Sequence, residues 1–314
     1  MNRNTSSAII VIAIVIPFSA SALWFSEQTK TTGFDREQQI TVLVSFHPLY
    51  EFTKEIGKEK IDVSTITPAG IEPHDWEPTI QDLQKMQQAD IIIINGVGFE
   101  TWLEDFVTNN QNTVIIDTSN GIELIESSDI LENYKYQDEK LNDGLNKDPH
   151  IWLDPVLAKK QIENIASALV KLDPKNAEYY NKNADVYNSK LNMLDNKIRT
   201  DLSTCNKKDF IAFHNAFAYF AKEYDLNQHT IIGVNPQAEP TAATLQKIIE
   251  NAKSLDLNII FTEEAVNPRI SEVLANEIGG KVLVLSPIEI PDENKDYISK
   301  MEQNLANLKE ELCS

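Results

Sequence analysis

Three histidines in this sequence lie where a metal ion could bind. His74 lies between two nearby prolines, His150 directly follows a proline, and His214 follows an apolar run. A proline fixes its own φ and restricts the residue before it, so the first two histidines are held in rigid turns. A lone histidine is more often structural than ligating. Neutral imidazole is nevertheless a preferred zinc ligand, and three histidines at the ends of separate elements predict one metal site.

Strands and helices alternate in the first half of the chain. Short β-branched or apolar runs predict strands at 40–44, 61–66, 91–94 and 114–116. Helical patterns between them predict helices at 49–56, 79–89 and 100–107, the second of them with Thr79 as its N-cap. This alternation indicates an α/β lobe with a parallel sheet, and it places His74 directly after the second strand.

A long helix without glycine or proline in its interior divides the chain. It is predicted from Pro174 to about Ser203, and a helical pattern that Pro155 opens and that continues to Val170 precedes it. At a rise of 1.5 Å per residue it would reach roughly 40 Å, enough to span two lobes. The alternation then resumes, with strands predicted at 210–213, 230–232, 258–262 and 282–285 and helices at 216–224, 241–255, 268–278 and 296–312.

The N-terminal segment carries features of protein export. Arg3 precedes an apolar run from Ala8 to Phe25, which contains the small-residue motif Ala20-Ser21-Ala22. A cleaved signal peptide and an uncleaved membrane anchor both fit, because the run is about as long as a bilayer requires. No cysteine lies nearby, so a lipid-modified cysteine anchor is not expected. The following residues up to Gln39 are polar and indicate a linker. The export segment implies that the folded body lies outside the cytoplasm.

Charge and cysteine content restrict the partners and the chemistry. The formal net charge of −20 argues against a nucleic-acid partner, since binding phosphates requires a basic surface. The two cysteines, Cys205 and Cys313, both follow long helical patterns. Outside the cytoplasm they could form a disulfide, while two unpaired thiols remain the alternative.

Several motifs in the same order resemble those of a known family, the metal-binding solute-binding proteins of zinc and manganese ABC importers (the ZnuA/TroA-like group, cluster A-I). The resemblance covers nearly all of the chain after residue 40, and it is carried by the segments 73–79, 150–155, 172–174, 213–217, 239–241 and 261–263. It implies a TroA-like helical-backbone receptor with two parallel-sheet α/β lobes and metal in the cleft between them. The predicted parts are an export segment with linker at 1–39, a lobe at 40–173, the long helix at 174–204, and a second lobe at 205–314.

The resemblance also implies the metal ligands. His74, His150 and His214 match three ligand positions of the family. Many members place an aspartate at the fourth position, where this chain has Ser286, but some zinc-binding members use a glutamate that matches Glu289. Manganese-selective members have a glutamate in place of His214. Because imidazole suits zinc and manganese prefers oxygen ligands, Zn²⁺ is the expected cargo.

The expected function is therefore high-affinity zinc capture outside the cytoplasm and delivery to an ABC importer permease, by a monomer associated with the membrane through its partner or its N-terminus. We expect no catalytic residues and no cofactor. Two alternatives stay open: a manganese or iron receptor of the same class, and a zinc hydrolase with water in place of Glu289, although no HExxH motif supplies a base. His47 and His229 are expected to be structural, and four acids are expected to act as caps or as partners of the ligands: Asp75, Glu77, Asp154 and Glu263.

Two further expectations concern the loop before His150 and the effect of pH. Residues 119–148 are acidic, contain no histidine, and are predicted to form a long solvated loop. Zinc affinity is expected to fall below about pH 6, since unperturbed imidazoles have a pKa of about 6.5 and must be neutral to bind metal.

Overall fold

The computed structural model describes residues 39–110, 113–126, 147–237 and 239–314. Residues from Ile40 to Ser314 form one compact unit. The predicted export segment and most of the acidic loop at 119–148 lie outside the described residues. Within the described part, no helix is both long enough and apolar enough to cross a membrane.

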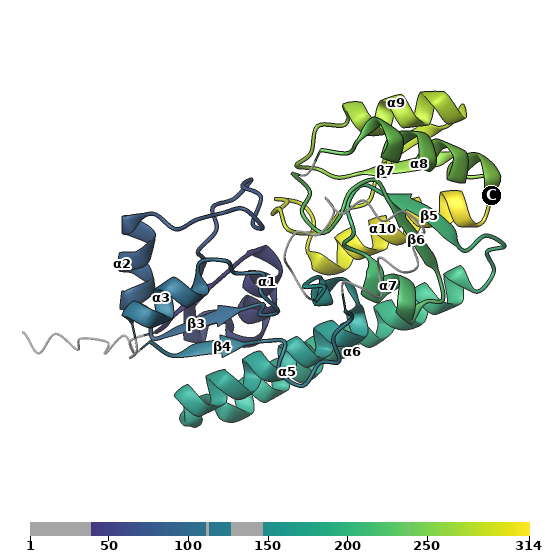
Figure 1. The fold of residues 1–314 in the computed structure, drawn as a ribbon. Helices are drawn as coiled ribbons and strands as arrows, with labels where there is room; N and C mark the ends of the chain where they lie inside the picture. The colour runs from purple at the N-terminus through teal and green to yellow at the C-terminus, as the bar shows by residue number, and fades with distance from the viewer. Residues whose placement is uncertain (1–38, 111–112, 127–146, 238) are drawn as a thin grey trace, which may run out of the picture. The chain divides into compact units, whose positions relative to one another are not determined.

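The first sheet has four parallel strands in the order β2-β1-β3-β4 (Figure 1). The strands are β1 (Ile40–Val44), β2 (Ile61–Thr65), β3 (Ile91–Ile94) and β4 (Ile115–Asp117), and the helices between them are α1 (His47–Gly57), α2 (Ile80–Gln88) and α3 (Leu103–Asn109). All four isoleucines of β3 are buried. A strand covered on both faces needs no polar alternation, which explains the apolar run in the sequence.

The second sheet repeats this arrangement in the order β6-β5-β7-β8, again with parallel strands. Its strands are β5 (Asp209–Ala212), β6 (Asn227–Thr230), β7 (Ile259–Thr262) and β8 (Lys281–Val284), and its helices are α7 (Ala218–Glu223), α8 (Ala242–Ser254), α9 (Arg269–Ile278) and α10 (Tyr297–Leu312). The expected fold class, two parallel-sheet α/β lobes, is confirmed.

One predicted strand, at 230–232, is wrong. The strand β6 covers the polar residues 227–230, and Ile231 and Ile232 follow it in a buried turn. Backbone pairing with β5 aligns Asp209 with Asn227, and this pairing decides the register. The edge strand thus tolerates polar residues, while the two isoleucines pack into the core of the second lobe.

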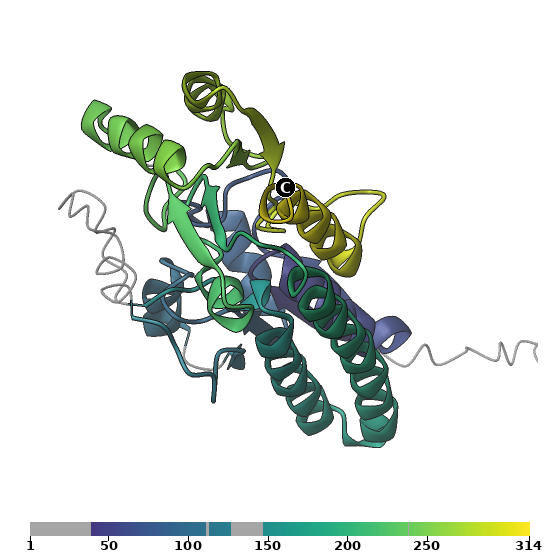
Figure 2. The ribbon, with the colours of Figure 1, turned by 90° about the vertical axis from the view of Figure 1, so that its right-hand side faces the viewer.

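Two long helices run side by side (Figures 1 and 2): α5 (Pro155–Leu172) and α6 (Ala177–Leu202). The helix α6 packs against α1 of the first lobe and α10 of the second. Its 26 residues rise over roughly 39 Å, and buried side chains recur along it at helical spacing. A short 3-10 turn, Pro174–Asn176, precedes it. The long connecting helix is therefore present, while the exact domain bounds remain a prediction.

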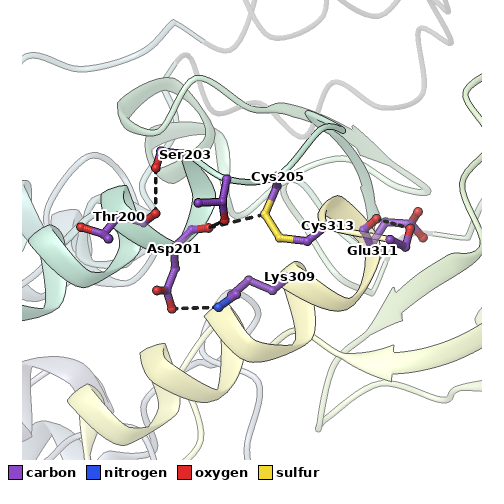
Figure 3. The surroundings of a disulfide bond; sticks show 9 residues. Thr200, Asp201, Ser203, Cys205, Lys309, Glu311 and Cys313 are labelled. Atoms are coloured by element: carbon purple, nitrogen blue, oxygen red, sulfur yellow. Dashed lines mark hydrogen bonds and ion pairs between the residues drawn. A yellow bond between two sulfur atoms is a disulfide. The ribbon is translucent and has the colours of Figure 1, made fainter.

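A disulfide joins the C-terminal ends of α6 and α10 (Figure 3). Cys205 follows α6, Cys313 follows α10, and the structure links them. Beside the bond, Lys309 Nζ lies 3.1 Å from a carboxylate oxygen of Asp201. Of the two possibilities left by the sequence, the disulfide is the one that the structure contains. It closes the second lobe onto the C-terminal end of α6.

Candidate metal centre

Four loops bring the candidate ligands together. His74 lies between β2 and α2, and His214 lies between β5 and α7. Glu289 lies between β8 and α10, and His150 directly precedes the short 3-10 turn that leads into α5. Three of these loops follow the carboxyl ends of parallel strands, which is where open α/β sheets commonly bind ligands. All four side chains are buried, with at most 7% of any residue exposed.

Capping residues fix the ends of the loops that carry His74 and His150. Thr79 closes the His74 loop as the N-cap of α2, in a capping box with Asp82. Asp154 caps α5 by accepting the N–H of Val156 at 2.7 Å. The predicted roles of Thr79 and Asp154 as caps are therefore confirmed.

Three of the distances between candidate ligand atoms are close to those of a tetrahedral site. His150 Nε2 lies 3.2 Å from both His74 Nε2 and His214 Nε2, and His74 Nε2 lies 3.5 Å from Glu289 Oε1. The four ligand atoms lie within 4.8 Å of one another. With zinc–nitrogen bonds of about 2.0–2.1 Å, tetrahedral neighbours would be roughly 3.3 Å apart. The spacing therefore suits a single small cation.

Two carboxylates orient two of the imidazoles. His150 Nδ1 donates to Asp148 Oδ1 at 2.8 Å, and His214 Nδ1 donates to Glu263 Oε1 at 2.6 Å. Each carboxylate also accepts the backbone N–H of the same histidine. These bonds place the proton on Nδ1 and leave the Nε2 lone pair facing the other ligands, as in many zinc sites. The expected role of Glu263 is confirmed.

Burial and neighbouring charges divide the three histidines. Burial lowers the pKa of His74 to about 4 and that of His150 well below its ordinary value. Burial also opposes the charge on His214, but the carboxylates of Glu263, Glu289 and Glu72 outweigh it and raise its pKa to about 9. Two imidazoles are thus neutral at pH 7, while the third holds a proton.

The carboxyl group of Glu289 has a raised pKa and, within the described part of the chain, an oxygen without a hydrogen-bond donor. Burial raises its pKa to about 8. Its Oε1 atom is buried without a hydrogen-bond donor among the described residues, although His74 Nε2 lies 3.5 Å away. A buried polar atom without a partner is costly unless a ligand satisfies it, and a metal ion at this position would do so.

The remaining predicted residues have mostly structural positions. His47 Nε2 lies 2.8 Å from Glu51, and His229 Nε2 lies 2.9 Å from Asp209. His47 lines a pocket that Glu289 also lines, but it is not among the four converging side chains. Asp75 accepts a hydrogen bond from Asn235, which joins a loop of the first lobe to one of the second.

Two acids near the centre were missed by sequence reasoning. Asp148 stands two residues before His150, and this short spacing could have indicated a side chain that turns back onto the histidine. Glu72 accepts the N–H of His74 at 3.2 Å, and burial followed by the charge of Glu289 raises its pKa to about 7. No local pattern marks Glu72, because its effect depends on how the loops pack.

Comparison with known families shows which family the chain belongs to. The profile described as "ZnuA: Zinc-uptake complex component A periplasmic" matches residues 42–311. The chain belongs to the ZnuA family. Its members are components of zinc uptake, which is a transport role and not an enzymatic one.

Individual ZnuA-family relatives are similar over most of the chain. It is 40% identical to the high-affinity zinc uptake system protein ZnuA of Bacillus subtilis, over 99% of both chains. It is 34% identical to the zinc-binding protein AdcA of Streptococcus pyogenes over 94% of its length, but spans only 61% of AdcA. The Zn(II)-bound ZnuA-like domain of Streptococcus pneumoniae AdcA superposes with a TM-score of 0.75 at 32% identity, covering 88% of this chain and 100% of that domain.

Proposed function

We propose that this protein captures Zn²⁺ with high affinity outside the cytoplasm and delivers it to an ABC-type membrane importer. The observation that carries the proposal is the convergence of three imidazole nitrogens and one carboxylate oxygen within 4.8 Å, all on buried side chains. Membership of a zinc-uptake family supports it. Zinc is the cargo of the site, and the protein works as a receptor, as a monomer.

The proposed ligands are His74, His150, His214 and Glu289. Three neutral imidazoles and one carboxylate give a closed tetrahedral site of net charge +1 around Zn²⁺. A catalytic zinc would keep one position open for water. The short distance from Glu289 Oε1 to His74 Nε2, 3.5 Å, supports Glu289 as the fourth ligand in place of water. The nitrogen-rich set favours zinc over manganese, which prefers oxygen ligands.

Zinc should raise the melting temperature of the protein. Binding to the folded state alone adds RT ln(1 + [L]/Kd), which is about 4 kcal/mol at a thousandfold excess of free zinc over Kd. The test is thermal unfolding of protein stripped with a chelator, with and without added ZnCl₂. Mg²⁺ is the matched control, because it demands oxygen ligands and should leave the melting temperature unchanged. A melting temperature that zinc does not move would refute tight binding.

Zinc affinity should continue to rise with pH well above the pKa of an ordinary histidine. The bound ion requires deprotonated ligands, while metal-free His214 and Glu289 hold protons up to about pH 9 and about pH 8. Lowering the pH therefore weakens binding throughout this range, and binding at neutral pH should release at least one proton. The sequence alone placed this loss below about pH 6, and the buried carboxylates around His214 move it upward.

The measurement is a competition titration between about pH 6 and pH 9, corrected for the protonation of the chelator, together with proton release into a weak buffer. If binding releases one proton, Kd should decrease about tenfold for each unit that the pH rises. An affinity that levels off at the ordinary histidine pKa would contradict a protonated His214 in the metal-free site.

A further inference from the structure

The loop that presents Glu289 is held from outside by the last helix. It runs from Ser286 to Ile290, between β8 and α10. Asn304, on α10, donates its side-chain amide to the carbonyl of Ser286 at 2.7 Å and accepts the N–H of the same residue at 2.8 Å. Asn304 is only 2% exposed, so this pair of bonds is shielded from water. One side chain thus satisfies both backbone groups at the start of the loop.

Two further side chains hold the rest of the loop. Lys300, also on α10, donates to the carbonyl of Ile290 at 2.6 Å and is 5% exposed. Trp152 Nε1 donates to the carbonyl of Pro287 at 2.8 Å, and this tryptophan is two residues from the ligand His150. The backbone on either side of Glu289 is therefore held by groups that belong to other parts of the fold.

The loop needs this support because its backbone is strained. Ile288, directly before Glu289, has φ = +64°, a left-handed conformation that β-branched residues rarely adopt. Its side chain is fully buried in the main core, and its N–H donates to Ser286 Oγ at 3.1 Å. Strained residues persist where the surroundings impose them, and they concentrate at ligand sites. The free loop would favour another conformation, in which Glu289 would not face His74.

We propose that Asn304 is a positioning residue, which holds the strained Ser286–Ile290 loop so that the Glu289 carboxylate reaches the metal. The inference rests on the proposed function, since it concerns the fourth zinc ligand. The side chain of Asn304 bonds to Ser286, three residues before Glu289, so its effect on zinc should pass through Glu289. Loss of a partner that orients a ligand typically costs 10–100-fold in metal affinity.

A double-mutant cycle tests this route. Zinc Kd is measured by chelator competition for the wild type, Asn304→Ala, Glu289→Ala and the double variant. We expect Asn304→Ala to weaken binding about tenfold or more, and to add nothing once Glu289 is replaced, because residues acting through one another are not additive. The visible absorption of bound Co²⁺, which reports coordination geometry, should shift in Asn304→Ala toward that of Glu289→Ala.

Asn307 provides the matched control on the same helix. Its side-chain amide donates to the carbonyl of Val284 at 2.7 Å, before the loop begins. Asn307→Ala removes a bond of the same length to a backbone carbonyl, although a more exposed one, and should leave both the zinc Kd and the Co²⁺ spectrum unchanged. If Asn304→Ala does not fold, Lys300→Met removes the bond at the other end of the loop while keeping an apolar stem. It should show the same dependence on Glu289.

The outcomes separate the two proposals. An equal loss from Asn304→Ala with and without Glu289 would overturn the positioning role and leave zinc capture intact. An unchanged Kd in Glu289→Ala would overturn both the fourth ligand and the positioning role. A wild-type protein that does not bind zinc would overturn the proposed function itself.

Discussion

Replacing His150 with alanine is expected to reduce zinc affinity by roughly a hundredfold or more. Its Nε2 lies 3.2 Å from the nitrogens of both other histidines, so it stands at the centre of the ligand set. Structural zinc sites bind with about 10–16 kcal/mol, which gives roughly 2.5–4 kcal/mol for each of four ligands. The variant should also lose most of the zinc-induced rise in melting temperature, since that rise depends on the ratio of zinc to Kd.

His229→Ala is the matched control for this substitution. His229 lies on β6 of the second sheet, and its Nε2 lies 2.9 Å from Asp209, outside the group of candidate ligands. Chelator competition with Zn²⁺ should give a wild-type Kd for His229→Ala and a strongly raised Kd for His150→Ala. Equal effects of the two substitutions, or a small effect of His150→Ala, would mean that the ion binds elsewhere.

Removing the disulfide is expected to lower the free energy of unfolding by about 2–5 kcal/mol. The bond joins residues 108 positions apart, and cross-linking so long a segment strongly restricts the unfolded chain. It also ties α10, the helix that holds the Glu289 loop, to the end of α6 (Figure 3). The loss should therefore appear as reduced stability of the metal-free protein, before any effect on zinc is considered.

The measurement is urea unfolding of the metal-free wild type and of the Cys205→Ser/Cys313→Ser variant, each with and without a reductant. Reductant should destabilise the wild type and leave the variant unchanged, so the variant controls for other actions of the reagent. Thiol labelling of denatured, unreduced wild type should find no free cysteine. Two labelled thiols, or equal stability of the two proteins, would show that the bond contributes nothing.

Local sequence was enough to find the three histidines, because their positions depend on short-range constraints. Prolines restrict the backbone beside His74 and His150, and capping residues end their loops within a few positions. The apolar run of β3 and the helical spacing along α6 likewise reflect local patterns that burial reinforces. The fold class and the three imidazoles could thus be predicted from sequence. Glu289 came only from its resemblance to a family position, since nothing adjacent marks it.

Tertiary structure alone decided how these groups behave. The strand β6 lies earlier in the sequence than predicted, because pairing with β5 outweighs the β-propensity of two isoleucines. His214 keeps a proton because three carboxylates, distant in sequence, converge on a buried ring. The left-handed backbone at Ile288 lies in a loop that hydrogen bonds from α10 and Trp152 join to distant parts of the chain. Each outcome depends on long-range packing or on electrostatic interactions in the low-dielectric interior. There the energy of a group is set by neighbours that are distant in the sequence.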